Sequence, residues 1–141
     1  LFLAGVLIIG LVSCKKQDNT EETQNSTEFV NEHTAQKSLD WTGEYKGVLP
    51  CADCEGIEIT ITLNPDETFY VKQEYLTENN NVAVESNGYF SWDKTGFIVT
   101  IEGSEEFRRS FKVVENALIY LDNGRSEVKG KTAELYRLTK Q

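Results

Sequence analysis

The 141-residue chain carries 14 basic and 23 acidic side chains, a formal net charge of −9, and 11% of its residues are aromatic. An acidic surface of this kind repels nucleic acid and anionic headgroups, so we expect no nucleic-acid partner. The length fits one domain of ordinary size with a short additional segment.

Residues 1–12 are uncharged and almost wholly apolar. This run is shorter than the ~20 residues that span a bilayer and is typical of an export signal whose true start lies upstream, since Met and a basic segment are missing. The following Leu-Val-Ser-Cys at 11–14 resembles a bacterial lipobox. It predicts a lipoprotein signal peptide at 1–13, cut before Cys14, which is then acylated and anchors the protein in the lipid bilayer. The alternative is an ordinary signal peptide with a chance cysteine.

Lys15 follows the lipidated cysteine, where Asp would favour inner-membrane retention. We therefore expect an outer-membrane anchor, with the periplasmic face favoured over the cell surface. Residues 14–40 are rich in Gln, Asn, Thr, Ser and Glu and are predicted to be a disordered tether. His33, the only histidine, lies in this segment and is interpreted as a solvated linker residue rather than a metal ligand.

Residues 41–141 form the predicted folded domain. Ile57, Ile59, Ile61 and Leu63 alternate with polar residues, which is the period-two pattern of a strand with one buried face. The same reasoning predicts strands at 41–49, 57–63, 69–75, 82–92, 97–102, 107–114, 117–121 and 134–138.

The predicted strands are joined mostly by short turns, and no long window shows a helical stripe. This predicts an all-β fold, an antiparallel eight-stranded lipocalin-like up-and-down barrel behind the disordered N-terminal tether, because closure removes exposed edges. A two-sheet sandwich is the alternative. Candidate inward or rim aromatic residues are Trp41, Tyr45, Phe69, Tyr75, Tyr89, Trp92 and Phe97. Arg108 and Arg109 are interpreted as a solvated face or a cross-strand ion pair rather than an anion site.

Cys51 and Cys54 lie three positions apart in a tight loop between two predicted strands. Two thiols at this spacing close a small disulfide, hold a soft metal ion such as Cu(I), or exchange electrons with another dithiol. A thioredoxin-type catalyst has a helix after such a pair, but here a strand follows, and the flanking Asp53 and Glu55 disfavour the thiolate. The lone histidine in the tether and the lack of Gly-rich phosphate loops also argue against an enzyme.

Residues 41–58 combine a strand with spaced glycines, the sequence Leu-Pro-Cys-Ala-Asp-Cys, and a following Gly and Ile-Glu. This stretch resembles the signature of the NlpE N-terminal domain family, lipoproteins of copper homeostasis and envelope stress. Weaker similarities follow in order at 64–68, 88–92 and 121–124. The resemblance therefore covers 41–141 and implies a lipocalin-like barrel on an outer-membrane lipid anchor. Glu67 departs from the family, which often has Gly in that turn, and some relatives add a second domain of oligonucleotide-binding fold.

The resemblance implies a role in copper homeostasis or envelope stress and redox sensing, with an envelope stress sensor protein as partner. Copper is the one cofactor it suggests, with Cys51 and Cys54 as ligands. Because the chain has no Met and no His near these thiols, only weak Cu(I) binding is expected. In the alternative, Cys51–Cys54 is a structural disulfide and the barrel interior binds a small apolar ligand.

Overall fold

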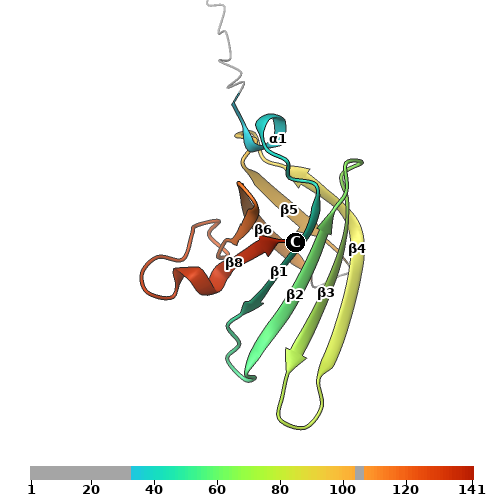
Figure 1. The fold of residues 1–141 in the computed structure, drawn as a ribbon, viewed down its shortest axis with the longest axis vertical. Coiled ribbons are helices and arrows are strands. Elements are labelled where there is room, and N and C mark those ends of the chain that lie inside the picture. Colours follow the sequence, from blue (N-terminus) through green and yellow to red (C-terminus); the bar gives the residue numbers. More distant parts are fainter. Residues whose placement is uncertain (1–32, 104–106) are drawn as a thin grey trace, which may run out of the picture. The chain divides into compact units, whose positions relative to one another are not determined.

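The computed structural model describes residues 33–103 and 107–141, and in this part eight strands form one closed sheet (Figure 1). The strands are β1 (Gly43–Leu49), β2 (Gly56–Leu63), β3 (Thr68–Leu76), β4 (Val82–Trp92), β5 (Ile98–Glu102), β6 (Arg108–Val114), β7 (Ala117–Tyr120) and β8 (Arg137–Lys140). Each strand is antiparallel to the next, and β8 pairs back onto β1. The predicted eight-stranded up-and-down barrel is confirmed, and the two-sheet alternative is wrong.

The core follows from the alternation in the sequence. Ile59, Ile61 and Leu63 of β2 are buried, and so are Phe69 and Val71 of β3, while the residues between them face outward. Because successive side chains of a strand point to opposite faces, one apolar set fills the barrel interior.

The closure of the barrel depends on Gly47. A Cβ atom at this position would lie 2.6 Å from Cδ2 of Leu138 and 2.8 Å from the carbonyl oxygen of Arg137. Only a glycine lets β8 approach β1 this closely, which explains one of the spaced glycines of the first strand.

The last strand differs from its prediction at 134–138. Residues Ala133–Tyr136 form a 3-10 helix, η1, and the strand begins only at Arg137. The N–H of Ala133 donates to the carbonyl of Gly130, and the N–H of Leu135 donates to that of Thr132. Local i to i+3 hydrogen bonds thus hold this segment, and the short alternation in the sequence was misleading.

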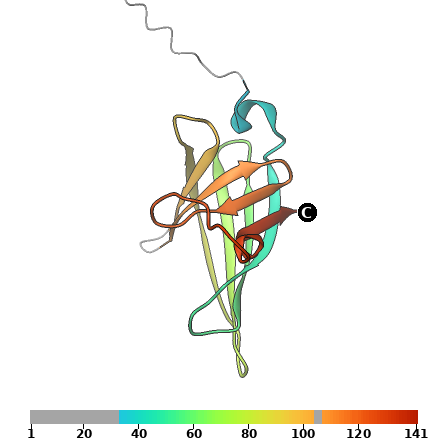
Figure 2. The ribbon, with the colours of Figure 1, turned by 90° about the vertical axis from the view of Figure 1, so that its left-hand side faces the viewer.

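One end of the barrel is closed by residues that the sequence assigns to the tether. Helix α1 (Ala35–Ser38) lies at the end where β1 begins (Figures 1 and 2), and Ala35 is only 1% exposed. The N–H of Gln36 donates to the carbonyl of Gly96, and the Trp41 indole donates to the carbonyl of Gln36. The packed part of the chain therefore begins before Trp41. His33, just ahead of this helix, is exposed.

Aromatic rings and a buried hydroxyl complete this closed end. Trp41, Phe90 and Trp92 make edge-to-face contacts with centroids 5.5–6.3 Å apart. The Tyr45 hydroxyl donates to the carbonyl of Trp41, and burial, with a contribution from the charge of Asp40, raises the pKa of Tyr45 to about 12.

The aromatic predictions are confirmed for Tyr45 and Phe69, which are buried, whereas Tyr89 was assigned to the wrong face. Tyr89 is 74% exposed and Phe90 is 4% exposed. Since β4 pairs with β3 in the register Tyr89 to Thr68, the inward face of β4 carries Phe90 and not its neighbour.

The signal peptide 1–13, Cys14 and the tether up to residue 32 lie outside the described residues. In the part that is described, no helix has both the length and the apolarity needed to cross a membrane.

Candidate functional site

The end of the barrel opposite α1 is where β1 ends, and we call it the mouth. The antiparallel order brings the connections 50–55, 77–81 and 121–136 to this end. In Figures 1 and 2 the hairpin of β3 and β4 extends well beyond the other strands on this side. Its inward face is therefore partly uncovered.

A cavity of about 390 Å³ opens at the mouth. This volume lies within the ~300–1,000 Å³ that small-molecule pockets have. Its walls come from opposite sides of the barrel, so it is the open end of the interior. The lining residues are Leu49, Pro50, Ile57, Gln73, Arg109, Tyr120, Asp122, Asn123, Val128 and Tyr136. The wall is thus mainly apolar and aromatic with a few polar groups.

Cys51 and Cys54 form a disulfide at the edge of this mouth, with Cα atoms 5.3 Å apart. This separation is ordinary for a disulfide. Both residues are half-buried. The loop is also tied to β3, because the N–H of Glu55 donates to the carbonyl of Leu76. It directly follows Leu49 and Pro50, so the disulfide and the cavity share one stretch of chain.

The oxidised loop does not fit a copper ion. Both sulfurs are bonded to each other, so neither offers a thiolate to a metal ion. Within residues 33–103 and 107–141, no group of three or more His, Cys, Asp or Glu side chains is placed to hold a metal. The predicted Cu(I) ligation by Cys51 and Cys54 stays a prediction for the reduced protein.

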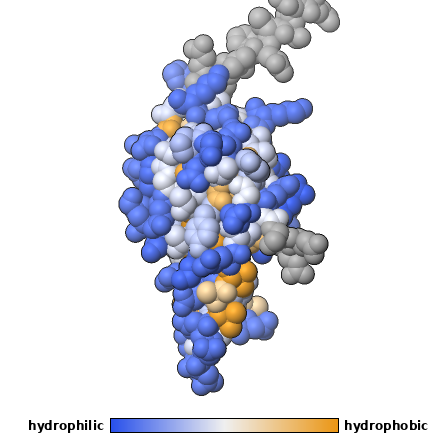
Figure 3. Space-filling view, turned by 90° about the vertical axis from the view of Figure 1, so that its right-hand side faces the viewer, coloured by the Kyte–Doolittle hydropathy of each residue, from blue (hydrophilic) through white to orange (hydrophobic). Residues whose placement is uncertain are grey.

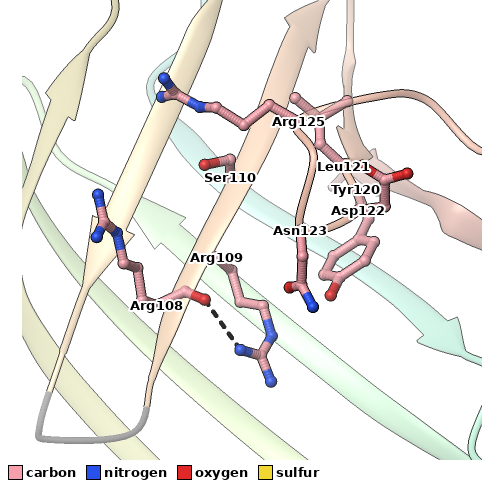
Figure 4. Close-up of a pocket in the computed structure, with 8 residues that line it drawn as sticks. All are labelled: Arg108, Arg109, Ser110, Tyr120, Leu121, Asp122, Asn123 and Arg125. Atoms are coloured by element: carbon pink, nitrogen blue, oxygen red, sulfur yellow. Dashed lines mark hydrogen bonds between the residues drawn. The ribbon is translucent and has the colours of Figure 1, made fainter.

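A second cavity of about 310 Å³ lies beside the mouth, between β6 and the connection that follows β7 (Figure 4). Arg108 and Arg109 extend to opposite sides of β6 in this view. Arg108 pairs with Glu102 across the β5–β6 ladder at 3.0 Å, as predicted. Arg109 shares the inward face of β6 with the buried Phe111, so its predicted place on a solvated face is wrong.

Arg125 lies on the same side as Arg108, with Ser110 between them (Figure 4). It has a positive φ of 60°, and its Nη2 donates to Oγ1 of Thr100 at 2.7 Å. Arg125 directly follows the turn at Asn123 and Gly124, and its backbone N–H donates to the carbonyl of Asp122. This arginine thus covers the outer face of β5 and β6.

The profile of the NlpE N-terminal domain matches residues 45–131, more than half of the chain. The chain belongs to the NlpE N-terminal domain family. Lipoprotein NlpE of Escherichia coli K12 is 32% identical over 78 residues, which are 55% of this chain and 33% of that protein. The chain therefore spans a third of the length of this curated relative.

Two solved structures share this NlpE-type fold. A crystal structure from Shewanella oneidensis, of a protein provisionally assigned as a lipoprotein, has a TM-score of 0.70 and 40% identity over 77% of this chain and 96% of that one. The Cpx pathway activator NlpE from Escherichia coli has a TM-score of 0.52 and 28% identity over 63% of this chain and 46% of that one.

Sequence reasoning located the Cys51–Cys54 loop of the NlpE-type barrel but missed most of the mouth. Gln73 was included only within the predicted strand at 69–75, and Tyr120 and Tyr136 were not singled out. The alternation gave a signal for Gln73, since it shares the inward face of β3 with Phe69 and Val71. The remaining residues come together only through the closure of the sheet.

Proposed function

We propose that this chain is an envelope lipoprotein of the NlpE type whose Cys51–Cys54 pair reports the redox state of the envelope to a stress sensor protein. An acylated Cys14 would anchor it in the outer membrane, facing the periplasm. The observation that carries the proposal is a half-buried disulfide at the mouth of a barrel of this family. The Escherichia coli relative is a Cpx pathway activator, which supports a signalling role here as well. In this proposal the protein acts as a stoichiometric signalling partner rather than as an enzyme.

The proposed chemistry is a two-electron exchange with a partner dithiol. A thiolate of the partner attacks one sulfur of the Cys51–Cys54 bond and forms a mixed disulfide, and the second sulfur leaves as a thiolate that takes up a proton. The second thiol of the partner then attacks the mixed disulfide. The partner ends as a disulfide, and Cys51 and Cys54 end as two thiols.

Such an exchange leaves the barrel intact. The β1–β2 ladder runs from Gly43 paired with Leu63 to Leu49 paired with Ile57, and none of these residues belongs to the disulfide loop. Reduction therefore changes the connection at 50–55, which lies at the surface where a partner protein can reach it. A local change in an otherwise stable domain suits a sensor.

The redox state of the thiols in the envelope tests the proposal. Cells are quenched with acid, free thiols are alkylated, and the masses of the cysteine peptides are measured with and without a reducing stress. We expect a disulfide in unstressed cells, two thiols under stress, and loss of the stress response in the Cys51→Ser, Cys54→Ser variant. An unchanged response in this variant would overturn the proposal. Palmitate labelling that persists in Cys14→Ala would remove the proposed anchor.

Copper is tested separately on the reduced protein. Titration with Cu(I) against a chelator of known affinity should show uptake by the wild type and none by the Cys51→Ser, Cys54→Ser variant. Equal uptake by both proteins would remove these residues as copper ligands without affecting the redox proposal.

The mouth cavity favours a second candidate function, the binding of a small apolar ligand, with the disulfide as a clip for the loop. Leu49, Ile57 and Tyr136 supply an apolar wall of the kind that such ligands need. Native mass spectrometry of protein purified gently from the envelope should show a co-purified small molecule. This function would be wrong if the purified protein carries no ligand and binds none of palmitate, lysophosphatidylglycerol and hexadecanol.

A further inference from the structure

Gln73 lies in the barrel interior without a hydrogen-bonding partner. It is 8% exposed and follows Phe69 and Val71 on the inward face of β3. Its side chain makes no hydrogen bond to any residue in 33–103 or 107–141, and it lines the mouth cavity. The amide nitrogen and oxygen of Gln73 are not among the fully buried side-chain atoms that lack a partner, so they reach the cavity, where two donors and an acceptor are open to a ligand. On the inward face of β3, the apolar series of Phe69 and Val71 thus ends in a polar group at the cavity.

Arg109 brings a positive charge into the same cavity. One of its N–H groups donates to the carbonyl of Arg108 at 2.9 Å, and its guanidinium lies 5.5 Å from the ring centre of Phe107. Four of its five N–H donors remain for other partners. The ion pairs between described residues include Arg108 but not Arg109. The carboxylate that lines this cavity, Asp122, accepts a hydrogen bond from the N–H of Ser126 in its own turn.

An apolar strip on the β3–β4 hairpin extends outward from the part of the cavity that contains Gln73 and Arg109. Val84 is paired with Gln73 across the β3–β4 ladder, and Val82 is paired with Tyr75 one step nearer the hairpin tip. Directly opposed residues share one face of a sheet, so both valines lie on the inward face. They are 47% and 52% exposed. Figure 3 shows an apolar patch on this lower, projecting part of the barrel.

We propose that the mouth binds an amphiphile with one acyl chain and one anionic headgroup. The headgroup oxygens accept hydrogen bonds from Arg109 and from the Gln73 amide, and the chain lies along the apolar wall and out over Val84 and Val82. A guanidinium suits this role because its planar fork matches the oxygens of a carboxylate or a phosphate. This inference rests on the second candidate function and specifies its ligand. A fatty acid and a lysophospholipid share this chemistry, and the test separates them.

The test uses the full chain with Cys14→Ala, so that no acyl group of its own competes, purified without detergent. A fluorescent fatty-acid analogue is bound and then displaced by palmitate, by lysophosphatidylglycerol or by the neutral hexadecanol. We expect palmitate or the lysolipid to displace the probe at least tenfold better than hexadecanol. The better of the two identifies the headgroup as carboxylate or phosphodiester.

The paired variants Arg109→Gln and Arg108→Gln remove the same charge from neighbouring residues on opposite faces of β6. Arg109→Gln should weaken the anionic ligand at least tenfold and leave hexadecanol unchanged. Arg108→Gln should change neither by more than threefold. Gln73→Leu should weaken the anionic ligand while leaving the thermal midpoint of the ligand-free protein unchanged or higher, since the amide reaches the cavity and makes no hydrogen bond to the residues that the structure describes. If Gln73 had a purely structural role, the Gln73→Leu substitution would lower both the affinity for the anionic ligand and the thermal midpoint.

The outcomes distinguish the apolar-ligand function from the recognition of an anionic headgroup. If hexadecanol competes as well as palmitate, the mouth binds apolar ligands but does not recognise an anion, and the present inference is wrong. Equal losses in Arg108→Gln and Arg109→Gln would mean general charge attraction and would also overturn it. If none of the three lipids displaces the probe, or the probe itself does not bind, the apolar-ligand function is wrong as well.

Discussion

Opening the Cys51–Cys54 disulfide should lower the free energy of unfolding by about 2 kcal/mol. The two cysteines are three positions apart, so the cross-link closes a loop of only four residues. The chain-entropy relation gives about 6 cal/mol/K for such a loop, or about 1.9 kcal/mol at 25 °C. For a domain of about 100 residues this corresponds to a fall of about 8 °C in the unfolding midpoint. The barrel should therefore stay folded after reduction.

Thermal unfolding followed by circular dichroism checks this value. The oxidised protein, the reduced protein and the Cys51→Ser, Cys54→Ser variant are compared, and the reductant is also added to the variant as a control. The reduced protein and the variant should unfold at similar temperatures, both below the oxidised protein. A difference under about 2 °C would refute the entropic reasoning. A fall of more than about 20 °C would show that the disulfide holds more than its own loop, and a sensor that stays folded in both states would then be untenable.

Three further changes test the fold. Gly47→Ala should cost about 1–3 kcal/mol in calorimetry, because the new Cβ would lie 2.8 Å from a backbone oxygen of β8; an unchanged midpoint would mean that β8 moves freely. Glu67→Gly should gain about 0.5–1 kcal/mol in urea unfolding, since Glu67 has a φ of 63°, whereas Glu67→Ala should gain nothing. Burial alone would raise the pKa of Asp93, but hydrogen bonds from Thr95 and from the N–H groups of Ile98 and Phe97 lower it below its ordinary value. Its ionised form therefore stabilises the fold above the unfolded pKa, and this stability is lost as the pH falls through the folded pKa. The stability difference between wild type and Asp93→Asn should shrink from about pH 5 to pH 2, and a constant difference would contradict this.

The features that could be predicted are those held by local sequence. Alternation along β2 and β3 gives both the strands and their buried faces, because a strand has a fixed period of two. The family similarity at 64–68 includes the turn between β2 and β3, and the departure at Glu67 from the family pattern now has a physical reason. The left-handed conformation of this residue is one that glycine adopts without strain.

The features that could not be predicted depend on contacts between distant segments. Tyr89 and Phe90 are both aromatic, and only the register of β4 against β3 decides which one is buried. Ala35 packs onto the barrel because Gly96 leaves room for the residue beside it, Thr34, a relation across 62 positions that composition does not reveal. A polar segment next to a barrel was therefore assigned entirely to the tether.

The residues of the mouth could not be predicted from the sequence for the same reason. Arg108 and Arg109 are equivalent in the sequence, and a basic pair on a strand is most often solvated. The strand places one of them beside Glu102 and the other inside the barrel, so one charge is paired and the other is available to a ligand. The loop with Cys51 is continuous with Leu49 and Pro50 of the same cavity. Under the redox proposal, a change in the loop upon reduction would therefore also act on the cavity wall. By thermodynamic linkage, a ligand that binds one redox state more tightly must favour that state by the same factor.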